Sequence, residues 1–367
     1  MRGQEENQGF MFTYLSPEQR VPKSHPLRRV KAFADRVLKE MSSLFNAMYS
    51  NLGRPSIPPE RLLKAQLLIA LYTVRSGRMF CERLDYDILF RWFLDMNLEE
   101  SSFDATSFTK NRERLLAHEV SLKFFDAVVR EARKQDLLSD EHFTVDGTLI
   151  DAWASTKSFQ PKETDDSDKQ PKGGGRNPTV DFHGEKRSNQ THQSTTDPEA
   201  RLMRKGPGKE AKLSFSGHAL MENRNGLCID LKINEATGHA EREAALSMLS
   251  RQGRKRVRPK TLGADKGYHS SDFINALRCK DIIPHIARVK NRKTYGLDGR
   301  TTRQAGYAVS QRIRKRVEEI FGWFKTVGGL RKTRFRGIER TQEYAFLVGA
   351  AYNLLRMSKL VPAGGVT

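Results

Sequence analysis

The chain has few cysteines, no long apolar run and a deficit of acidic residues. Cys81, Cys228 and Cys279 are the only cysteines among 367 residues, and no two have metal-site or redox-motif spacing. This excludes a disulfide framework and favours a reducing, cytoplasmic setting. The first 20 residues lack the apolar segment of a signal peptide. The longest apolar stretch, residues 62–74, is too short and too interrupted to span a bilayer, so we expect no membrane partner.

Positive charge dominates instead. Lysine and arginine number 64 against 44 acidic residues, which gives a net charge of +20 and a pI near 9.9. Such an excess favours a polyanionic partner, with nucleic acid ahead of a membrane, although a solvated basic surface is the alternative. The hydrophobic fraction of 37% excludes a disordered chain, and the length indicates two or three domains.

Residues 1–135 are predicted to form an all-α domain. Apolar residues recur at helical spacing in 27–49 and again in 56–75, where two prolines stand at the start of the segment. Shorter helices are expected over 81–96 and 102–116. A bundle of this kind would serve DNA binding or oligomerisation.

Residues 136–360 are predicted to form a mixed α/β domain. The expected order is a strand, a β-hairpin around "NRNG", and then alternating helices and strands. A polar, partly mobile insertion is expected at about 155–212, with a loop over 164–178. Its histidines, His183 and His192, have no paired ligand spacing, so we expect no zinc site.

Two aspartates stand at strand positions typical of a site. Asp146 lies in "TVDGT", where alternation puts it on the face opposite Val145. Asp265 follows the short apolar strand of "LGADKGY", and open α/β sheets bind ligands beyond the carboxyl ends of their strands. For each aspartate the alternative is a turn residue. Asp151 competes with Asp146, but it faces the other way if the strand is continuous.

A third carboxylate is predicted on a late helix, in "RIRKRVEEIFGWFK". On a continuous α-helix Glu318 lies about 40° from Arg314, and Lys325 lies about 20° from it. Glu319 lies about 140° away, toward solvent or other cations. We therefore select Glu318 rather than Glu319 as the site residue.

Three converging carboxylates suit a divalent metal, because Mg²⁺ prefers oxygen ligands. Two such ions would activate an attacking oxygen and stabilise a leaving one in phosphodiester cleavage. Residues 286–340 carry 16 basic and 4 acidic residues, enough to hold a DNA backbone beside the metals. The alternative is a solvated basic surface.

These segments together resemble the insertion-sequence DDE transposases, in particular the group named after bacterial insertion sequence five. "TVDGTLIDAWAS", "ADKGY" and "RIRKRVEEIFGWFKTVGGLRKTRFRG" resemble its three acidic motifs in order, and the likeness spans nearly the whole chain. Related transposases carry Tyr-x2-Arg-x3-Glu-x6-Lys. Arg314, Glu318 and Lys325 match this spacing, whereas Gln311 replaces the tyrosine.

The resemblance implies an RNase H-like catalytic fold in which Asp146, Asp265 and Glu318 hold two Mg²⁺ or Mn²⁺ ions. It implies binding to terminal inverted repeats, cleavage that frees a 3′-hydroxyl, and attack of that hydroxyl on target DNA. It further implies a homodimer or larger assembly on double-stranded DNA, in the bacterial cytoplasm at the nucleoid. The expected DNA-contacting residues are Gln311, Arg314, Lys315, Lys325, Arg331, Lys332, Arg334 and Arg336.

Two alternatives to an active transposase stay open on the sequence. One is an inactive or domesticated DNA-binding relative, which the three intact acids disfavour. The other is an RNase H-like nuclease, which the N-terminal helical domain disfavours.

Overall fold

The structure is a computed structural model that describes residues 14–49, 52, 55–162, 188–206, 208–238, 240–289 and 297–362. The predicted loop over 164–178 and His183 lie outside the described residues. The N-terminal part is helical: α1 (Pro17–Arg20), α2 (Leu27–Glu40), α3 (Ser42–Met48), α4 (Pro59–Leu71), α5 (Gly77–Tyr86), α6 (Ile88–Phe93), α7 (Ala105–Ala117) and α8 (Val120–Lys134).

The sheet follows these helices. Its strands are β1 (His142–Asp151), β4 (Arg201–Arg204), β5 (Ala211–Glu222), β6 (Cys228–Glu235), β7 (Thr261–Ala264) and β8 (Ile283–Ile286). Strands β2 (Phe159–Pro161) and β3 (His192–Ser194) form a separate small sheet. The predicted polar insertion therefore contains ordered strands, because backbone pairing holds even these polar residues.

Pairing within the large sheet is mixed. Strand β5 pairs antiparallel with β1, β4 and β6, whereas β7 pairs parallel with both β1 and β8. The central order is therefore β6-β5-β1-β7-β8, the order of an RNase H-like sheet. This confirms the predicted class, a mixed α/β domain that follows an all-α part.

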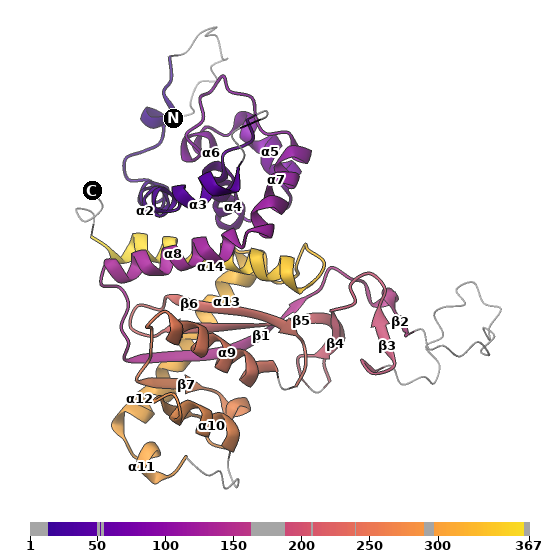
Figure 1. Ribbon diagram of the computed structural model, residues 1–367, viewed down its shortest axis with the longest axis vertical. Helices are drawn as coiled ribbons and strands as arrows, with labels where there is room; N and C mark the ends of the chain where they lie inside the picture. The colour runs from indigo at the N-terminus through magenta and orange to yellow at the C-terminus, as the bar shows by residue number, and fades with distance from the viewer. Residues whose placement is uncertain are drawn as a thin grey trace, which may run out of the picture.

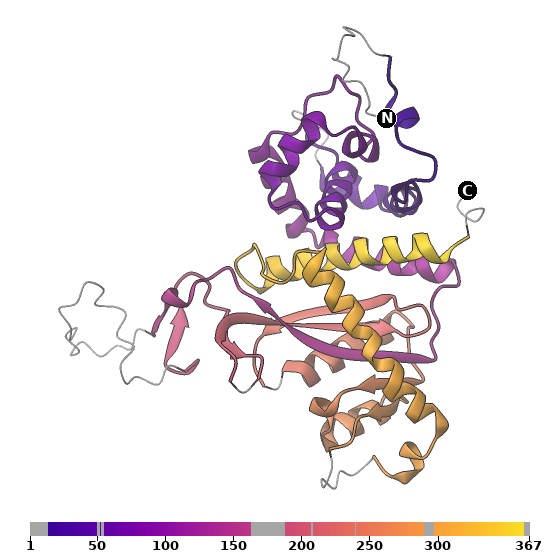
Figure 2. The ribbon, with the colours of Figure 1, turned by 180° about the vertical axis from the view of Figure 1, so that it is seen from behind.

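Helices cover both faces of the sheet. They are α9 (Ala240–Arg254), α10 (Ser271–Arg278), α11 (Gly299–Thr302), α12 (Ala305–Ile313), α13 (Val317–Thr326) and α14 (Ile338–Leu360). Helix α9 lies in front of the sheet in Figure 1, and α13 crosses its opposite face in Figure 2. The two faces of β1 therefore meet different helices.

Helix α14 joins the helical part to the sheet. It packs against β6 on one side and against α8, α4 and α2 on the other. Figures 1 and 2 both show α8 and α14 side by side between the two parts. Most of the 23-residue helix is buried, and its apolar side chains belong to one continuous core. Among the described residues, no helix is both long enough and apolar enough to cross a membrane.

The helix predicted around Glu318 is not one regular α-helix. Helices α12 and α13 are joined by a 3₁₀ turn, η3 (Arg314–Arg316). A 3₁₀ turn advances 120° per residue rather than 100°, so three residues add roughly 60° of rotation. Arg314 and Glu318 are therefore farther apart around the axis than a continuous helix predicts, whereas Glu318 and Lys325 stay on one face of α13.

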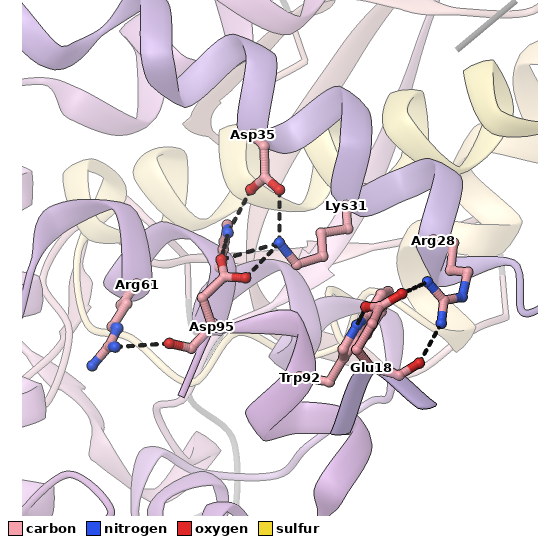
Figure 3. A network of polar contacts seen from close by, with 8 residues as sticks. Glu18, Arg28, Lys31, Asp35, Arg61, Trp92 and Asp95 are labelled. Atoms are coloured by element: carbon pink, nitrogen blue, oxygen red, sulfur yellow. Dashed lines mark hydrogen bonds and ion pairs between the residues drawn. The ribbon is translucent and has the colours of Figure 1, made fainter. Parts of the chain in front are cut away.

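An ion network ties the N-terminal helices together (Figure 3). Lys64 on α4 is 5% exposed, and its ammonium contacts the carboxylates of Asp35 and Asp95, the latter at 2.5 Å. Lys31 lies 2.7 Å from Asp35 and 2.8 Å from Asp95. Burial alone would raise the pKa of Asp95, but hydrogen bonds from Lys31 and Lys64 outweigh it and lower that pKa.

We expect Lys64→Met to destabilise the protein by about 1–3 kcal/mol, because two carboxylates lose a buried partner. Since the pKa of folded Asp95 is depressed, the pair stabilises the fold above the ordinary pKa of 3.8 and stops doing so as the pH falls below it. Denaturant unfolding at pH 7 and near pH 2, below the depressed pKa of Asp95, measures this. Lys39→Met, on the exposed side of α2, is the control. A Lys64→Met penalty that persists at acid pH would contradict the ionic account.

Candidate active site

Strands β1 and β7 part beyond Thr144, and we call this point of separation the crevice. The two strands pair only from His142 to Thr144 on β1, and β7 ends at Ala264. Beyond this point β1 continues for seven residues, paired with β5 on its other side. Asp146 and Asp265 follow directly past the last paired residues of the two strands. The crevice therefore lies at the carboxyl end of β7, where open α/β sheets bind ligands.

The surroundings of Tyr268 indicate which acids lie near the crevice. Its side chain is fully buried, and its hydroxyl has no hydrogen-bond partner among the described residues. Burial raises the pKa of Tyr268 well above its usual range, and the charges of Glu241, Asp146 and Asp265 raise it further. The charges of three carboxylates therefore act on one phenol.

Burial and neighbouring charges shift the pKa of Asp146. Burial raises its pKa to about 6, and Asp265 and Glu241 add to the rise, whereas the Gly147 N–H and Arg314 oppose it. The N–H group of Gly147 donates a 2.8 Å hydrogen bond to the Asp146 carboxylate. On β7 the Asp265 carboxylate caps the turn η2 (Lys266–Tyr268) by accepting from the N–H group of Gly267 at 2.8 Å.

Glu241 is a site residue that sequence reasoning missed. It stands in the first turn of α9, where the positive end of the helix dipole favours an acid. A methyl group added at Gly147 would lie 3.3 Å from Glu241 Oε1, and one added at Gly267 would lie 3.2 Å from Oε2. The glycines beside both aspartates thus leave room for this carboxylate. In the sequence, the glycine near each aspartate was the sign that a further side chain lies close by.

Contacts along β1 show how α12 and η3 run beside this strand. Ser310 Oγ lies 3.1 Å from His142 Nε2 at the start of the strand. Arg316 donates at 2.7 Å to the carbonyl oxygen of Asn223, whose side-chain oxygen accepts from Thr144 at 2.8 Å.

Lys325 then packs beside Thr148 and Ile150, on the face of β1 that Asp146 shares. Glu318 lies on α13 between Arg316 and Lys325, and its place in one site with Asp146 and Asp265 stays a prediction. The side chain is exposed and makes no hydrogen bond or ion pair within the described part of the chain. Glu319 instead lies 3.8 Å from Arg356 on α14.

The predicted cations take different places. Arg314 lies close enough to Asp146 to lower its pKa. Burial lowers the pKa of Lys325, Lys205 and Arg331 nearby lower it further, and Asp151 opposes them. Gln311 donates a 2.6 Å hydrogen bond to the His285 carbonyl oxygen, so it supports the end of β8. Its contact with DNA stays a prediction.

The other predicted DNA-contacting residues differ in exposure and in partners. Lys315 and Arg331 are exposed, and the Lys332 ammonium lies 5.5 Å from the ring centre of Trp153. Arg334 donates to the carbonyl oxygen of Val74, and Arg336 is exposed.

The two residues set aside on sequence grounds are held elsewhere. Strand β1 is continuous, so Asp151 faces away from Asp146, and its backbone pairs with residues 331–333. His192 is buried and stacks on Phe159 with 5.5 Å between ring centres.

The residues present suit a divalent cation. All donors at the crevice are carboxylates, and burial raises the pKa of Asp146, so a bound cation would stabilise its charged form. Among the described residues, no three acidic, histidine or cysteine side chains stand close enough together to share an ion. Ion binding would therefore draw these side chains inward.

A mixed sheet of this order, with acids from two strands and neighbouring helices, defines an enzyme of phosphodiester cleavage and joining. Comparison with known families makes the class specific. Residues 139–354 match the family described as "Transposase DDE domain", and residues 15–114 match "Transposase domain (DUF772)". The chain belongs to the DDE transposase family. It is a DNA transposase, an enzyme that cleaves and joins DNA strands with divalent metal ions.

Solved structures give weaker likenesses. A piggyBac transposase synaptic complex with hairpin DNA is 11% identical, with 91% of this chain and 75% of that chain covered, at a TM-score of 0.37. A Mos1 transposase paired-end complex with the left transposon end is 10% identical, with 92% and 97% covered, at a TM-score of 0.21. These values are too low to align site residues.

We expect Asp146→Asn to stabilise the metal-free protein by on the order of 1 kcal/mol, because it removes a buried charge beside two like charges. Thermal unfolding in a chelator measures this. Asp151→Asn, on the same strand and 3.9 Å from Lys212, is the control and should give no gain. A melting temperature for Asp146→Asn at or below that of the parent would show that the Asp146 charge does not destabilise the metal-free protein.

Proposed function

We propose that this transposase binds the terminal inverted repeats of its own insertion sequence and acts on both their ends and a target DNA. In the first step water attacks a phosphorus atom at the element end, and the bond from phosphorus to the 3′-oxygen breaks. This frees a 3′-hydroxyl and leaves a 5′-phosphate. In the second step that hydroxyl attacks a target phosphorus, and the target's 3′-oxygen leaves.

The residues of the crevice divide this work. Asp146, Asp265 and Glu318 would hold two Mg²⁺ ions, with Mn²⁺ as a substitute. When bound, the ions supply activation of the attacking oxygen and stabilisation of the leaving oxygen. Arg314 lies beside Asp146 and would bind a non-bridging oxygen of the scissile phosphate, since a guanidinium matches phosphate geometry. Lys325 would bind a neighbouring phosphate on the same face of α13.

One observation carries the proposal. Asp146 and Asp265 come from different strands and stand together where β1 and β7 part, under one common neighbour, Tyr268. Glu318 would join them from α13, and three carboxylates suit two ions rather than one.

The partners follow from the reaction. Joining two ends to one target requires two active sites, so we propose that a homodimer or larger assembly forms on double-stranded DNA. The DNA substrate would place the protein at the bacterial nucleoid. The net charge of +20 supports this partner, because lysine and arginine release counterions from DNA when they bind.

Glu318→Gln should lower metal-dependent cleavage of element ends by more than about 100-fold and leave DNA binding intact, because a metal ligand is lost. Glu319→Gln, which removes only a contact with Arg356, should cleave normally. Cleavage of a labelled inverted-repeat duplex in Mg²⁺, with binding measured in Ca²⁺, tests the pair. An active Glu318→Gln protein beside a dead Glu319→Gln protein would reverse the assignment.

Glu241→Gln should lower cleavage by about 10- to 100-fold, with the loss partly recovered at high Mg²⁺ concentration, because Glu241 shapes the charge around the two aspartates. Glu243→Gln is the matched control, since Glu243 is exposed in the same turn of α9. Titration of activity with Mg²⁺ is the measurement. An unchanged Mg²⁺ requirement in Glu241→Gln would show that this carboxylate has no part in ion binding.

A further inference from the structure

A second cleft lies between the N-terminal helices and the sheet domain, away from the carboxylates. It encloses about 1000 Å³. Helix α4, the start of α5 and the first half of α7 form one wall. Trp153 beyond the end of β1, residues 334–336 and the start of α14 form the other. The chemistry proposed at the crevice does not use this cleft.

Its charge is strongly positive. Six arginines line it, and Glu113 is the only acidic residue in the lining. The arginines are Arg75, Arg78, Arg112, Arg334, Arg336 and Arg340.

Three of these arginines have protein partners. Arg334 donates to the carbonyl oxygen of Val74, and Arg340 lies 3.0 Å from Glu113. Arg112 stacks over the ring of Phe335 at 5.1 Å. Burial lowers the pKa of Arg112; Glu113 opposes this change, and nearby Arg340 lowers the pKa further. Protein contacts therefore hold these three side chains in the walls of the cleft.

The other three arginines face the opening. Arg75, Arg78 and Arg336 are exposed and form no salt bridge within the described residues. Arg75 and Arg78 flank the start of α5, and Arg336 stands opposite them. Cations that converge from two walls without acidic partners are arranged for an anion supplied from outside.

The inner lining of the cleft includes a second, independent sign of a ligand. Gln66 on α4 is 2% exposed and lines the cleft, and its side-chain Nε2 has no hydrogen-bond partner among the described residues. Leaving a buried amide donor unpaired costs about 1–3 kcal/mol, so such groups usually serve a partner. A donor beneath a ring of guanidinium groups suits a phosphate oxygen.

We propose that this cleft binds the phosphate backbone of one DNA strand, with Arg75, Arg78 and Arg336 on its phosphates and Gln66 donating to a phosphate oxygen. The inference rests on the proposed function, which supplies the DNA. Trp153 lies seven residues beyond Asp146, at most roughly 23 Å along an extended chain. The Trp153 end of the cleft is therefore within roughly seven base-pair rises of Asp146, since a base pair rises about 3.4 Å. The DNA is either the element end or the target.

The test compares Arg75→Gln/Arg78→Gln with Arg254→Gln/Arg258→Gln, a pair of equal charge on exposed positions at the far end of α9. Binding of full-length protein to an inverted-repeat duplex is measured by fluorescence anisotropy across salt concentrations. Loss of two phosphate contacts should reduce the salt slope by about 2 and weaken binding by roughly 10-fold or more for the cleft pair alone. Strand transfer of pre-cleaved ends into a plasmid is measured in parallel.

The outcomes separate the two sources of DNA. A defect in end binding assigns the cleft to the element end, and a defect confined to strand transfer assigns it to the target. Equal effects of both pairs, or no effect of either, would overturn the proposal while the parent protein still cleaves. A parent protein that neither cleaves nor transfers would instead refute the proposed function.

Gln66→Leu separates a ligand contact from a structural role. Leucine removes the unpaired donor at nearly the same volume, so the melting temperature should hold or rise while DNA affinity falls by about 10-fold. Unchanged affinity would show that the amide is not a DNA contact.

Discussion

Burial of carboxylates near one another is the constraint on which the acidic crevice depends. The charges of Asp146, Asp265 and Glu241 all act on one buried phenol, in a protein whose net charge is +20. The fold holds these acids by fixing their backbones in strands and helix starts, where packing elsewhere compensates for the local cost. Arg314 offsets part of the charge. Under the proposed function, the remainder would favour a small, highly charged cation.

The separation of β1 from β7 creates the space for this chemistry. Had the two strands stayed paired beyond Thr144, backbone hydrogen bonds would occupy the position of the crevice. Helices α9 and α13 then close it from opposite faces (Figures 1 and 2). Gly147 and Gly267 also leave space near the two aspartates, because a Cβ atom at either position would press on the Glu241 carboxylate.

The sequence was sufficient for the mixed α/β class and for the order from the β-hairpin to β8, since period-two and period-3.6 patterns are local, but β2, β3, β4 and α14 were not predicted. The choice of Glu318 over Glu319 stays a prediction, and Glu319 lies 3.8 Å from Arg356. It could not find Glu241 or Gln66, because their neighbours come from distant segments. The 3₁₀ turn at Arg314–Arg316 was equally hidden, since three basic residues in a row fit either helix type.

Helix α14 gives the molecule a fixed internal scale. It packs against the sheet and against three helices of the N-terminal part. Under the proposed function, this packing would hold a DNA backbone bound in the arginine-lined cleft at a set distance from the crevice.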